Sequence, residues 1–479
     1  MADIDWLLDQ VARSKTGPGV AAFFDFDGTL IDGYSAGAFF KSRLKHGEVG
    51  IKELVASVNE AVNVERRGHS IDELMRMGVQ AQAGERAADV NKWARTIFAK
   101  RIAGMLFPEA RELIEAHQDM GHTIVVASSA TTPQIEATAD DLGIPNIICT
   151  EVEIDEDGFM TGNLASPIRW GQGKAQGVLE FAEQWDIKLA DSFSYSNGAE
   201  DIPFLETTGH PVALNPDKKL VKIAKDKGWP VAFLQRPPKT TPLDVLRTTA
   251  AMGALSGSVV VGSLLGLFKR NRQDGANFAA KIGGSTALTA AGVELNIVGE
   301  ENAWNDRPAI FLFNHQSQLD VFVLAAVLER DFTGVAKKQL EKSPLFAPLG
   351  YLADVAYIDR ANREKAIHQL EPVVQTLKDG RSIVISPEGT RSPTTRLLPF
   401  KKGPFHMAMQ AGVPVVPFIM RNCGELMAAH SYVIHPGTVD VAILPAIYTD
   451  DWTPENMEEN IEGVRQQFLD TLRDWPKSA

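Results

Sequence analysis

The chain of 479 residues is 44% hydrophobic and 23% charged, which supports packed cores over most of its length and argues against extended disorder. A formal net charge of -13, without a segregated basic patch, argues against a nucleic-acid partner. Cys149 and Cys423 stand far apart and outside any zinc-ligand spacing, so we expect no disulfide, no zinc cage and a reducing cytoplasm. The acidic, amphipathic N-terminus is unlike a secretory signal, and export is not expected.

Residues 20–215 alternate short apolar runs, such as VAAFF and TIVVAS, with stretches of helix-forming sequence. This rhythm predicts a Rossmann-like α/β domain with a parallel sheet, which we place at residues 1–235. The stretch 33–103 contains no convincing strand and many helix formers. We therefore expect a helical cap inserted directly after the first strand.

Two acids follow the first predicted strand. Asp25 and Asp27 lie two residues apart, so their side chains would point the same way in an extended segment. Paired carboxylates can bind Mg²⁺ and divide phosphoryl transfer, one attacking phosphorus and the other serving as acid and base. The alternative is an Asp-Gly turn without a catalytic role. The pattern alone leaves both interpretations open.

The segment DFDGTL resembles the DxDxT signature of the haloacid dehalogenase superfamily, and the similarity extends to about Pro216, closest to the phosphoserine-phosphatase-like branch. Asn197 departs from the family pattern, in which an aspartate binds magnesium, and an amide there weakens a hard-cation site. The resemblance leaves two expectations, a Mg²⁺-dependent phosphatase or an inactive scaffold or dimerisation module. It implies catalytic Asp25 and Asp27, phosphate-binding Ser128 and Lys174, and a metal site of Asp25, Asp27, Asn197 and Asp201.

Two shorter patterns in the same region are set aside. Gly33–Gly37 spells the GxSxG of a hydrolase elbow, but it lacks a strand of its own. DFDGTL also begins like a calcium loop, but the sixth and twelfth positions are Leu30 and Ala36 instead of Gly and Glu. We expect neither a serine hydrolase nor a calcium site here.

Residues 236–276 form a predicted linker followed by an apolar segment. Thr248–Phe268 contains 21 residues without a charge, which as a helix would span about 31 Å, near the thickness of a bilayer core. Basic residues flank both ends, so a hairpin or in-plane insertion fits better than one crossing, with residues 277–298 as the second helix. The alternative is a buried helix of a soluble core.

Small residues recur at close-packing distance in this segment. Gly253 and Gly257, and then Gly262 and Gly266, form two GxxxG spacings that allow another helix to approach closely. We expect membrane lipid as a partner of the segment and a homodimer as one use of its glycines.

A second chemical motif follows the predicted strand AIFLF. His315 begins at the strand end, and Asp320 follows five residues later, at the start of an apolar helix pattern. A histidine can act as general base on a hydroxyl, and a carboxylate can fix its tautomer. Ser317 and Asp320 also fit a capping box, in which the acid only caps the helix. Both interpretations stay open on this motif alone.

A third motif, SPEGTRS, follows the strand-like SIVIS. It combines Glu388, Gly389, Thr390 and Arg391 in one turn, and such a set suits a phosphorylated polyol because arginine binds phosphate through a planar fork of donors. The alternative for its cations is a solvated surface. Arg360, at the end of another predicted strand, and Lys337 and Lys338 add further positive charge.

Residues 290–420 resemble the PlsC-type lysophospholipid acyltransferases, whose four blocks match in order as NHQSQLD, AYIDR, SPEGTRS and VPVVPF. Block three usually begins with Phe, where this chain has Ser386. The resemblance implies a C-terminal α/β acyltransferase domain at residues 277–479, at the cytoplasmic face of the membrane, with acyl-CoA as donor. The expected acceptor is lysophosphatidate, and the alternative is another lysophospholipid or a phosphorylated glycolipid. It implies His315 as base, Asp320 as its partner and glycerol phosphate bound by Arg360, Glu388, Gly389, Thr390 and Arg391. We add Lys338 to this expected substrate site because of its charge.

No Ser or Cys in the motifs has the setting of an activated nucleophile. We therefore expect the acceptor hydroxyl to attack the thioester directly in a ternary complex, without an acyl-enzyme.

Overall fold

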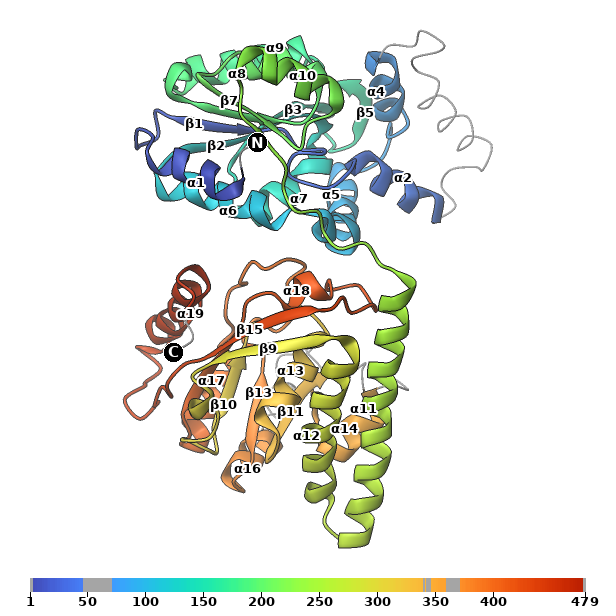
Figure 1. Ribbon diagram of the computed structural model, residues 1–479, viewed down its shortest axis with the longest axis vertical. Helices are drawn as coiled ribbons and strands as arrows, with labels where there is room; N and C mark the ends of the chain where they lie inside the picture. The colour runs from blue at the N-terminus through green and yellow to red at the C-terminus, as the bar shows by residue number, and fades with distance from the viewer. Residues whose placement is uncertain (1–2, 46–70, 339–340, 342–345, 359–370, 477–479) are drawn as a thin grey trace. The chain divides into compact units, whose positions relative to one another are not determined.

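The computed structural model describes residues 3–45, 71–338, 341, 346–358 and 371–476. The chain divides into two compact units, Met1–Pro237 and Pro238–Ala479, each with its own sheet (Figure 1). Arg360, proposed as a substrate ligand, lies outside the described residues.

The N-terminal unit contains a six-stranded sheet in the order β3-β2-β1-β6-β7-β8, with every pairing parallel. The predicted Rossmann-like α/β fold is therefore confirmed. Parallel strands buried on both faces read as continuous apolar runs, which is why VAAFF and TIVVAS were recognisable. The strands are β1 (Ala21–Phe24), β2 (Thr123–Thr131), β3 (Asn146–Thr150), β6 (Phe193–Ser196), β7 (His210–Leu214) and β8 (Val231–Ala232).

Side chains of β1 alternate between two hydrophobic cores. Ala22 and Phe24 face a core shared with α1 and α6, whereas Ala21 and Phe23 face a core shared with α8 and α10. Both faces of the sheet are thus covered. The helices are α1 (Ile4–Ala12), α6 (Pro108–Asp119), α7 (Thr132–Leu142), α8 (Gln172–Gln184), α9 (Ile202–Leu205) and α10 (Lys218–Lys227).

The described part of the cap is mainly helical, as expected, with α2 (Ser35–Lys45), α4 (Ile71–Gln80) and α5 (Ala87–Ile97). A hairpin of β4 (Val152–Ile154) and β5 (Met160–Leu164) also contacts α4, and it was not foreseen. The Gly84 amide donates to the Met160 carbonyl at 2.8 Å, so this hairpin is bonded to the cap.

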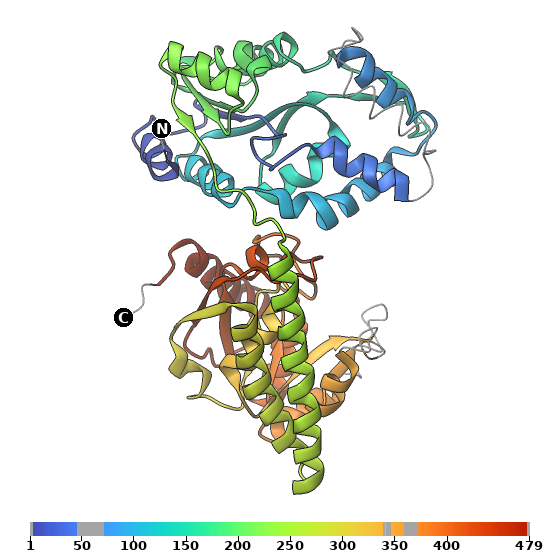
Figure 2. The ribbon, with the colours of Figure 1, turned by 45° about the vertical axis from the view of Figure 1, so that its right-hand side comes forward.

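The apolar segment forms a helical hairpin within the second unit, where α11 (Pro242–Lys269) lies against α12 (Arg272–Ala291), as both ribbon views show (Figures 1 and 2). The hairpin was foreseen, but the expected range of its second helix is wrong. Gly292 ends α12 in the left-handed conformation (φ +74°), and the alternating residues that follow form β9 (Val293–Val298).

The glycines of α11 differ in what surrounds them. A Cβ on Gly262 would lie 2.4 Å from the Gly275 carbonyl oxygen of α12, so this glycine permits the close contact inside the hairpin. A Cβ on Gly253 or Gly257 would meet no atom within 4 Å in the described chain. The Gly262 spacing is therefore used within the chain, and only the Gly253–Gly257 pair stays open to another partner.

The second unit is built on a seven-stranded sheet in the order β12-β11-β13-β10-β14-β15-β9. Its central strand β10 pairs in parallel with β13 and β14, and only the β14–β15 pairing is antiparallel. The strands are β10 (Ile310–Phe313), β11 (Phe332–Lys337), β12 (Ala356–Ile358), β13 (Ser382–Ile385), β14 (Val415–Met420) and β15 (Gly437–Ile443), and the helices around them include α13 (Leu319–Leu328), α14 (Phe346–Ala353), α16 (Glu371–Lys378), α17 (Gly403–Ala411), α18 (Cys423–Leu426) and α19 (Met457–Arg473).

Candidate active sites

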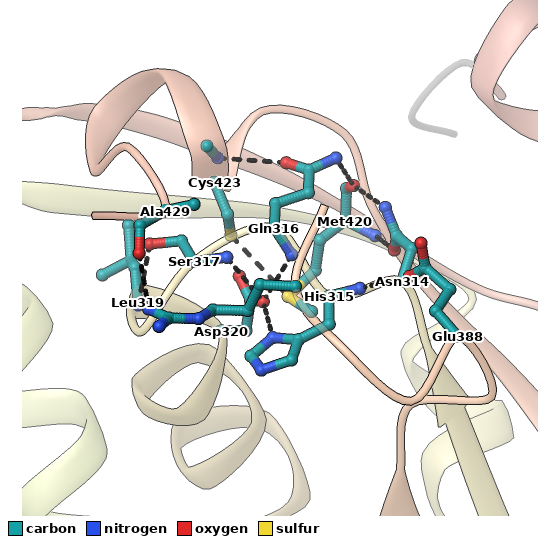
Figure 3. Close-up of polar contacts among 12 residues, drawn as sticks. Asn314, His315, Gln316, Ser317, Leu319, Asp320, Glu388, Met420, Cys423 and Ala429 are labelled. Atoms are coloured by element: carbon teal, nitrogen blue, oxygen red, sulfur yellow. Dashed lines mark hydrogen bonds and ion pairs between the residues drawn. The ribbon is translucent and has the colours of Figure 1, made fainter. Parts of the chain in front are cut away.

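His315 lies directly beyond the carboxyl end of β10, in the turn that leads into α13. Its Nδ1 lies 2.7 Å from Asp320 Oδ2, and Figure 3 shows the ring beside that carboxylate. Within the described residues Nε2 has no hydrogen-bond partner, and 25% of the side chain is exposed. With a carboxylate at Nδ1, the imidazole presents Nε2 as the nitrogen that can accept a proton.

Asp320 is fully buried and organises this turn. Its Oδ2 accepts hydrogen bonds from the backbone amides of Gln316 at 2.9 Å and Ser317 at 3.0 Å, besides facing His315. The two interpretations of the motif are therefore compatible. The same carboxylate accepts hydrogen bonds from the amides near the helix start and orients the imidazole. Both functions require Asp320 to lie in the same turn as His315.

Asn314 fixes the turn from the other side. Its Nδ2 donates to the Met420 carbonyl at 2.7 Å and its Oδ1 accepts from the Met420 amide at 2.8 Å, so the side chain joins the ends of β10 and β14. Gln316 also contacts this edge, because its Oε1 accepts from the Gly424 amide at 3.0 Å. These two amides were not singled out from the sequence, since their partners are distant backbone groups.

The Glu388–Ser392 turn lies against the histidine turn. Glu388 Oε1 accepts from the His315 amide at 2.7 Å, and the Ser392 amide donates to the His315 carbonyl at 2.8 Å. Glu388 Oε2 accepts from the Leu398 amide at 2.8 Å. Both carboxylate oxygens are thus bonded to backbone, and burial raises the pKa of Glu388 to about 7 although these hydrogen bonds act to lower it.

Gly389 and Lys401 form a close pair that the sequence did not reveal. Gly389 has φ +73°, and a Cβ there would lie 2.8 Å from Lys401 Nζ. Lys401 is exposed, and no acid in the described chain forms an ion pair with it. Thr390 is exposed beside it, whereas Arg391 donates from Nη1 to the Ala429 carbonyl at 2.5 Å. The turn therefore brings the positive charges of Lys401 and Arg391 close to the backbone of Gly389.

Two further residues concern the predicted substrate site, the cation Lys338 and the departure Ser386. Lys338 directly follows β11 and is exposed. Ser386, which stands where block three usually has Phe, has a buried hydroxyl without a hydrogen-bond partner in the described chain. Leaving this hydroxyl unsatisfied costs about 1–3 kcal/mol of stability.

Two potential nucleophiles near His315 are poorly suited to covalent catalysis. Cys423 is completely buried, and burial, with the charge of Asp320 adding to it, raises the pKa of its thiol far above the usual value. Ser317 is also buried, and its Oγ accepts from the Leu319 amide at 3.1 Å.

The N-terminal unit gathers charges at the equivalent edge of its own sheet. Asp25 follows β1, Lys174 lies in α8, and Asp201 follows β6. Lys174 Nζ donates to Asp25 Oδ1 at 2.7 Å and to Asp201 Oδ2 at 2.5 Å, and all three side chains are buried. Burial raises the pKa of Asp25 to about 7, while the neighbouring Lys174 cation opposes this shift.

Asp27 is held away from that lysine by Ser35. Its Oδ1 accepts from the Ser35 amide at 2.7 Å and its Oδ2 accepts from the Ser35 hydroxyl at 3.1 Å, at the first residue of α2. Burial raises the pKa of Asp27, whereas these hydrogen bonds lower it. The serine of the GxSxG pattern, Ser35, therefore positions the Asp27 carboxylate and does not form a hydrolase elbow.

The oxygen atoms around Asp25 fit Mg²⁺, but Asn197 supplies a neutral amide oxygen where the family pattern has a carboxylate. Asp201 Oδ1 is buried without a hydrogen-bond partner in the described chain, and Asn197 Oδ1 lies 3.4 Å from the Thr29 hydroxyl, which also donates to Asp25. These are oxygen donors, as Mg²⁺ prefers. The described residues contain no cluster of three His, Cys, Asp or Glu that could hold a metal. Ser128 lies nearby in β2 and is buried.

Comparisons with known proteins agree with this division. Residues 22–206 match the family of haloacid dehalogenase-like hydrolases, and residues 294–421 match the acyltransferase family. The fold and the two sites therefore define a two-domain enzyme with a hydrolase-type and an acyltransferase-type unit.

Three individual relatives indicate the families of the two units more specifically. A 1-acyl-sn-glycerol-3-phosphate acyltransferase of Cocos nucifera is 31% identical over 240 residues, which cover 49% of this chain and 77% of the relative. A yeast protein of the same name, from Saccharomyces cerevisiae, is 38% identical over 186 residues, and the match spans 38% of this chain and 61% of the yeast protein. A Mycobacterium tuberculosis protein named "Probable phosphatase" is 32% identical over 259 residues, covering 52% of this chain and 90% of that protein. The chain belongs to the 1-acyl-sn-glycerol-3-phosphate acyltransferase family and carries an N-terminal unit of the haloacid dehalogenase-like hydrolase family.

Proposed function

We propose that the C-terminal unit transfers an acyl group from acyl-CoA to the free hydroxyl of lysophosphatidate, which yields phosphatidate. The observation that carries this proposal is the His315–Asp320 pair, with Nε2 free at the carboxyl end of β10. The printed names of the Cocos nucifera and yeast relatives support the acceptor.

The reaction needs one proton acceptor and no covalent enzyme intermediate. Nε2 of His315 takes the proton of the acceptor hydroxyl while its oxygen attacks the thioester carbonyl. The carbon–sulfur bond then breaks, and the departing thiolate takes the proton from the imidazolium. Asp320 holds the ring and stabilises the imidazolium between these steps. The buried states of Cys423 and Ser317 are consistent with direct transfer.

The phosphate of the acceptor is assigned to the turn at Gly389. Lys401, Thr390 and Arg391 supply donors there, and the missing side chain at Gly389 leaves the space in which the Lys401 side chain lies against the turn. Lys338 and Arg360 stay as further proposed ligands. Glu388 instead acts as a positioning residue, because both of its oxygens bind backbone amides of the site.

The helical hairpin is proposed to bring this site to a membrane surface. Helix α11 is long and apolar enough to cross a bilayer, by length and composition, and only 33% of its most apolar window is buried. Exposed side chains along it include Leu264, Leu267 and Phe268. Such an apolar face would associate with lipid, on the cytoplasmic side where acyl-CoA is available. The open Gly253–Gly257 pair offers a contact for a second copy.

The acceptor is tested by offering the full-length protein acyl-CoA and a panel of lysophospholipids while following thiol release. Lysophosphatidate should be preferred over lysophosphatidylcholine and lysophosphatidylethanolamine, because only its terminal phosphate monoester is free to bind the cations near Gly389. Equal release with a zwitterionic acceptor would favour the alternative, an acyltransferase for another lysophospholipid or a glycolipid.

A second function is favoured by the buried Lys174 between Asp25 and Asp201. We propose that the N-terminal unit hydrolyses phosphate monoesters. An Asp25 oxygen attacks phosphorus, and the ester oxygen leaves with a proton from Asp27. Water then attacks the phosphoaspartate and gives its proton to Asp27, which releases phosphate and restores Asp25. Mg²⁺ bound beside Asp25, Asn197 and Asp201 would neutralise the phosphoryl oxygens.

Phosphate release in the presence of Mg²⁺ tests this second function. It should disappear in Asp25→Asn, while thiol release from acyl-CoA stays at the wild-type rate because Asp25 belongs to a separate unit. If no phosphate monoester is hydrolysed, the alternative of an inactive scaffold or dimerisation module is favoured.

A further inference from the structure

A cavity of about 360 Å³ opens beside Asp27 between the core and the cap of the N-terminal unit. Its volume falls within the range of small-molecule sites, about 300–1,000 Å³. Ser129 and Ala130, which directly follow Ser128, line it, and so does Trp170, which precedes the helix of Lys174. A phosphoryl group held at Asp25 would therefore direct its ester group into this cavity.

The described walls of the cavity are mostly apolar. Phe39 comes from α2, Met75 and Val79 from α4, and Val90 and Trp93 from α5, with Trp170 on the core side. Two of these are tryptophans, which offer large apolar faces. The surface facing the ester group thus resembles a hydrophobic binding pocket.

The one cation in the described walls is already neutralised. Arg43 donates from Nη2 to both oxygens of Glu85, at 2.9 and 3.1 Å, and its guanidinium lies 5.2 Å from the centre of the Trp93 ring. Besides Asp27, no other charged residue lines the described cavity. Both oxygens of Asp27 already accept hydrogen bonds from Ser35, so the ammonium of an amino acid would compete with Ser35, and its carboxylate would find no free cation in the described walls.

Two glutamine side chains of the described walls form hydrogen bonds within the protein. Gln134 Oε1 accepts from the amide and the hydroxyl of Thr131, at 2.8 and 3.0 Å. Gln82 donates to the Gly78 carbonyl at 3.2 Å. A polyol would compete with these bonds at Gln134 Oε1 and Gln82 Nε2, whereas an alkyl or aryl group would displace water without such competition.

We infer that the N-terminal site takes phosphate monoesters of apolar alcohols, such as alkyl phosphates or 1-acylglycerol phosphates, in preference to phosphoserine or glycerol phosphate. This inference rests on the second proposed function. Hydrolysis breaks the phosphorus–oxygen bond of the ester, and water supplies the hydroxyl of phosphate and the proton of the alcohol. The cavity contributes by removing the apolar group from water.

Phosphate release by the full-length protein with Mg²⁺ measures the preference. Each methylene buried from water contributes roughly fourfold to kcat/KM, so hexyl phosphate should exceed ethyl phosphate at least tenfold. Phosphoserine and glycerol phosphate should remain near ethyl phosphate. Water-soluble 1-hexanoylglycerol phosphate distinguishes an acylglycerol source from a simple alkyl phosphate. Preference for phosphoserine or glycerol phosphate would overturn the inference.

A matched pair of glycine substitutions locates the effect. Gly78 lines the cavity within α4 and has open space at its Cβ, so Gly78→Phe fills the cavity without backbone strain. It should reduce the advantage of hexyl over ethyl phosphate at least tenfold. Gly37 on α2 is exposed with open space at its Cβ and lies outside the described lining, so Gly37→Phe should keep that advantage. Equal effects of both variants would contradict the assignment.

Binding separates failure of catalysis from failure of the inference. Trp93 and Trp170 line the cavity, so hexyl phosphate should change tryptophan fluorescence saturably in the wild type and far less in Gly78→Phe. If this fluorescence change occurs without phosphate release, the proposed phosphatase activity is contradicted, but the apolar binding site is supported. If neither hydrolysis nor the fluorescence change occurs, the inference is overturned.

Discussion

The two units place charged side chains at the same position, the carboxyl end of a central parallel strand, but they leave these charges in opposite states. In the N-terminal unit the Lys174 cation is buried and bonded to both Asp25 and Asp201. In the C-terminal unit Lys401 is exposed without an acidic partner in the described residues, and His315 keeps one ring nitrogen free. A ligand of the N-terminal site must therefore compete with the ion pairs of Lys174, whereas an anion can bind Lys401 in the C-terminal site without breaking an ion pair.

This contrast indicates different sensitivities to substitution. Removing one member of a buried ion pair leaves an uncompensated charge and disturbs folding, typically by 3–5 kcal/mol. Removing an exposed cation mainly weakens ligand binding. Lys174 should therefore be essential to the stability of its unit, while Lys401 should be dispensable for folding.

The largest effect on the open site is expected from Asp320→Asn. The amide cannot stabilise an imidazolium at His315, and it disturbs three hydrogen bonds to one oxygen. The kcat of acyl transfer should fall on the order of 10³-fold. Asp440→Asn, which changes an acid bonded to Asn296 at the β9–β15 edge, is the control and should keep wild-type kcat. Near-normal kcat in Asp320→Asn would remove Asp320 from the mechanism.

A smaller effect is expected from Lys401→Met, which removes the cation beside Gly389. The KM for lysophosphatidate should rise roughly tenfold or more, because a charge-assisted hydrogen bond contributes about 1.5–3 kcal/mol. The neighbouring Lys402 pairs with Glu458, so Lys402→Met is a matched loss of charge and should leave KM unchanged. Equal changes in both variants would show that only net charge matters.

The pH dependence of the open site should report on Glu388. Its pKa is raised to about 7 by burial, so protonation below that pH removes an acceptor from the His315 or Leu398 amide. Acyl transfer should therefore rise with pH through about 7. Because the folded state holds the Glu388 proton more tightly than the unfolded chain, this proton stabilises the folded state. The stabilisation is complete below pH 4.5 and is lost as pH rises through 7.

Glu388→Gln separates this group from the histidine. The variant should lose activity at high pH and also lose the activity change that Glu388 causes near pH 7. Thermal unfolding monitored over the same range should lose its matching dependence. A pH profile identical to the wild type would assign the transition to another group.

The smallest effect concerns the closed unit, where His117 is buried between His122 and Tyr195. Burial lowers the pKa of His117 well below 6.5 and also lowers that of His122. The unfolded chain takes up protons below pH 6.5 that the folded state does not, so stability is lost as pH falls. The two histidines should therefore contribute a Tm decrease of a few degrees between pH 7 and 5, opposite in sign to the contribution of the raised pKa values of Asp25 and Asp27. Relative to the wild type, His117→Gln should raise the Tm at pH 5 more than at pH 7, and exposed His406→Gln should not.

Sequence patterns predicted the parts of the fold in which local and tertiary preferences agree. Buried strands such as β1 and β10 are continuous apolar runs, and the sheet class followed from their spacing. The β4–β5 hairpin was missed because its strands are short and carry Glu153, Gly162 and Asn163, which are poor strand formers. Strand β9 was missed because the preceding helix was expected to continue past Gly292 to residue 298.

The site was predictable only where a motif is contiguous. His315 and Asp320 lie in one turn, so their contact could be foreseen. Lys401 could not, because its role depends on the left-handed backbone at Gly389, twelve residues earlier in the chain. Ser35 was set aside as part of a false elbow, since its contact with Asp27 exists only once the cap begins there.

The most direct test of the account is acyl transfer by His315→Ala, followed as lysophosphatidate-dependent thiol release from acyl-CoA, with circular dichroism and Mg²⁺-dependent phosphate release as measures of folding. Loss of the general base should reduce thiol release by a factor of about 10²–10⁴ while the other two signals stay unchanged. Thiol release at the wild-type rate would contradict the central claim that the His315 imidazole accepts the hydroxyl proton.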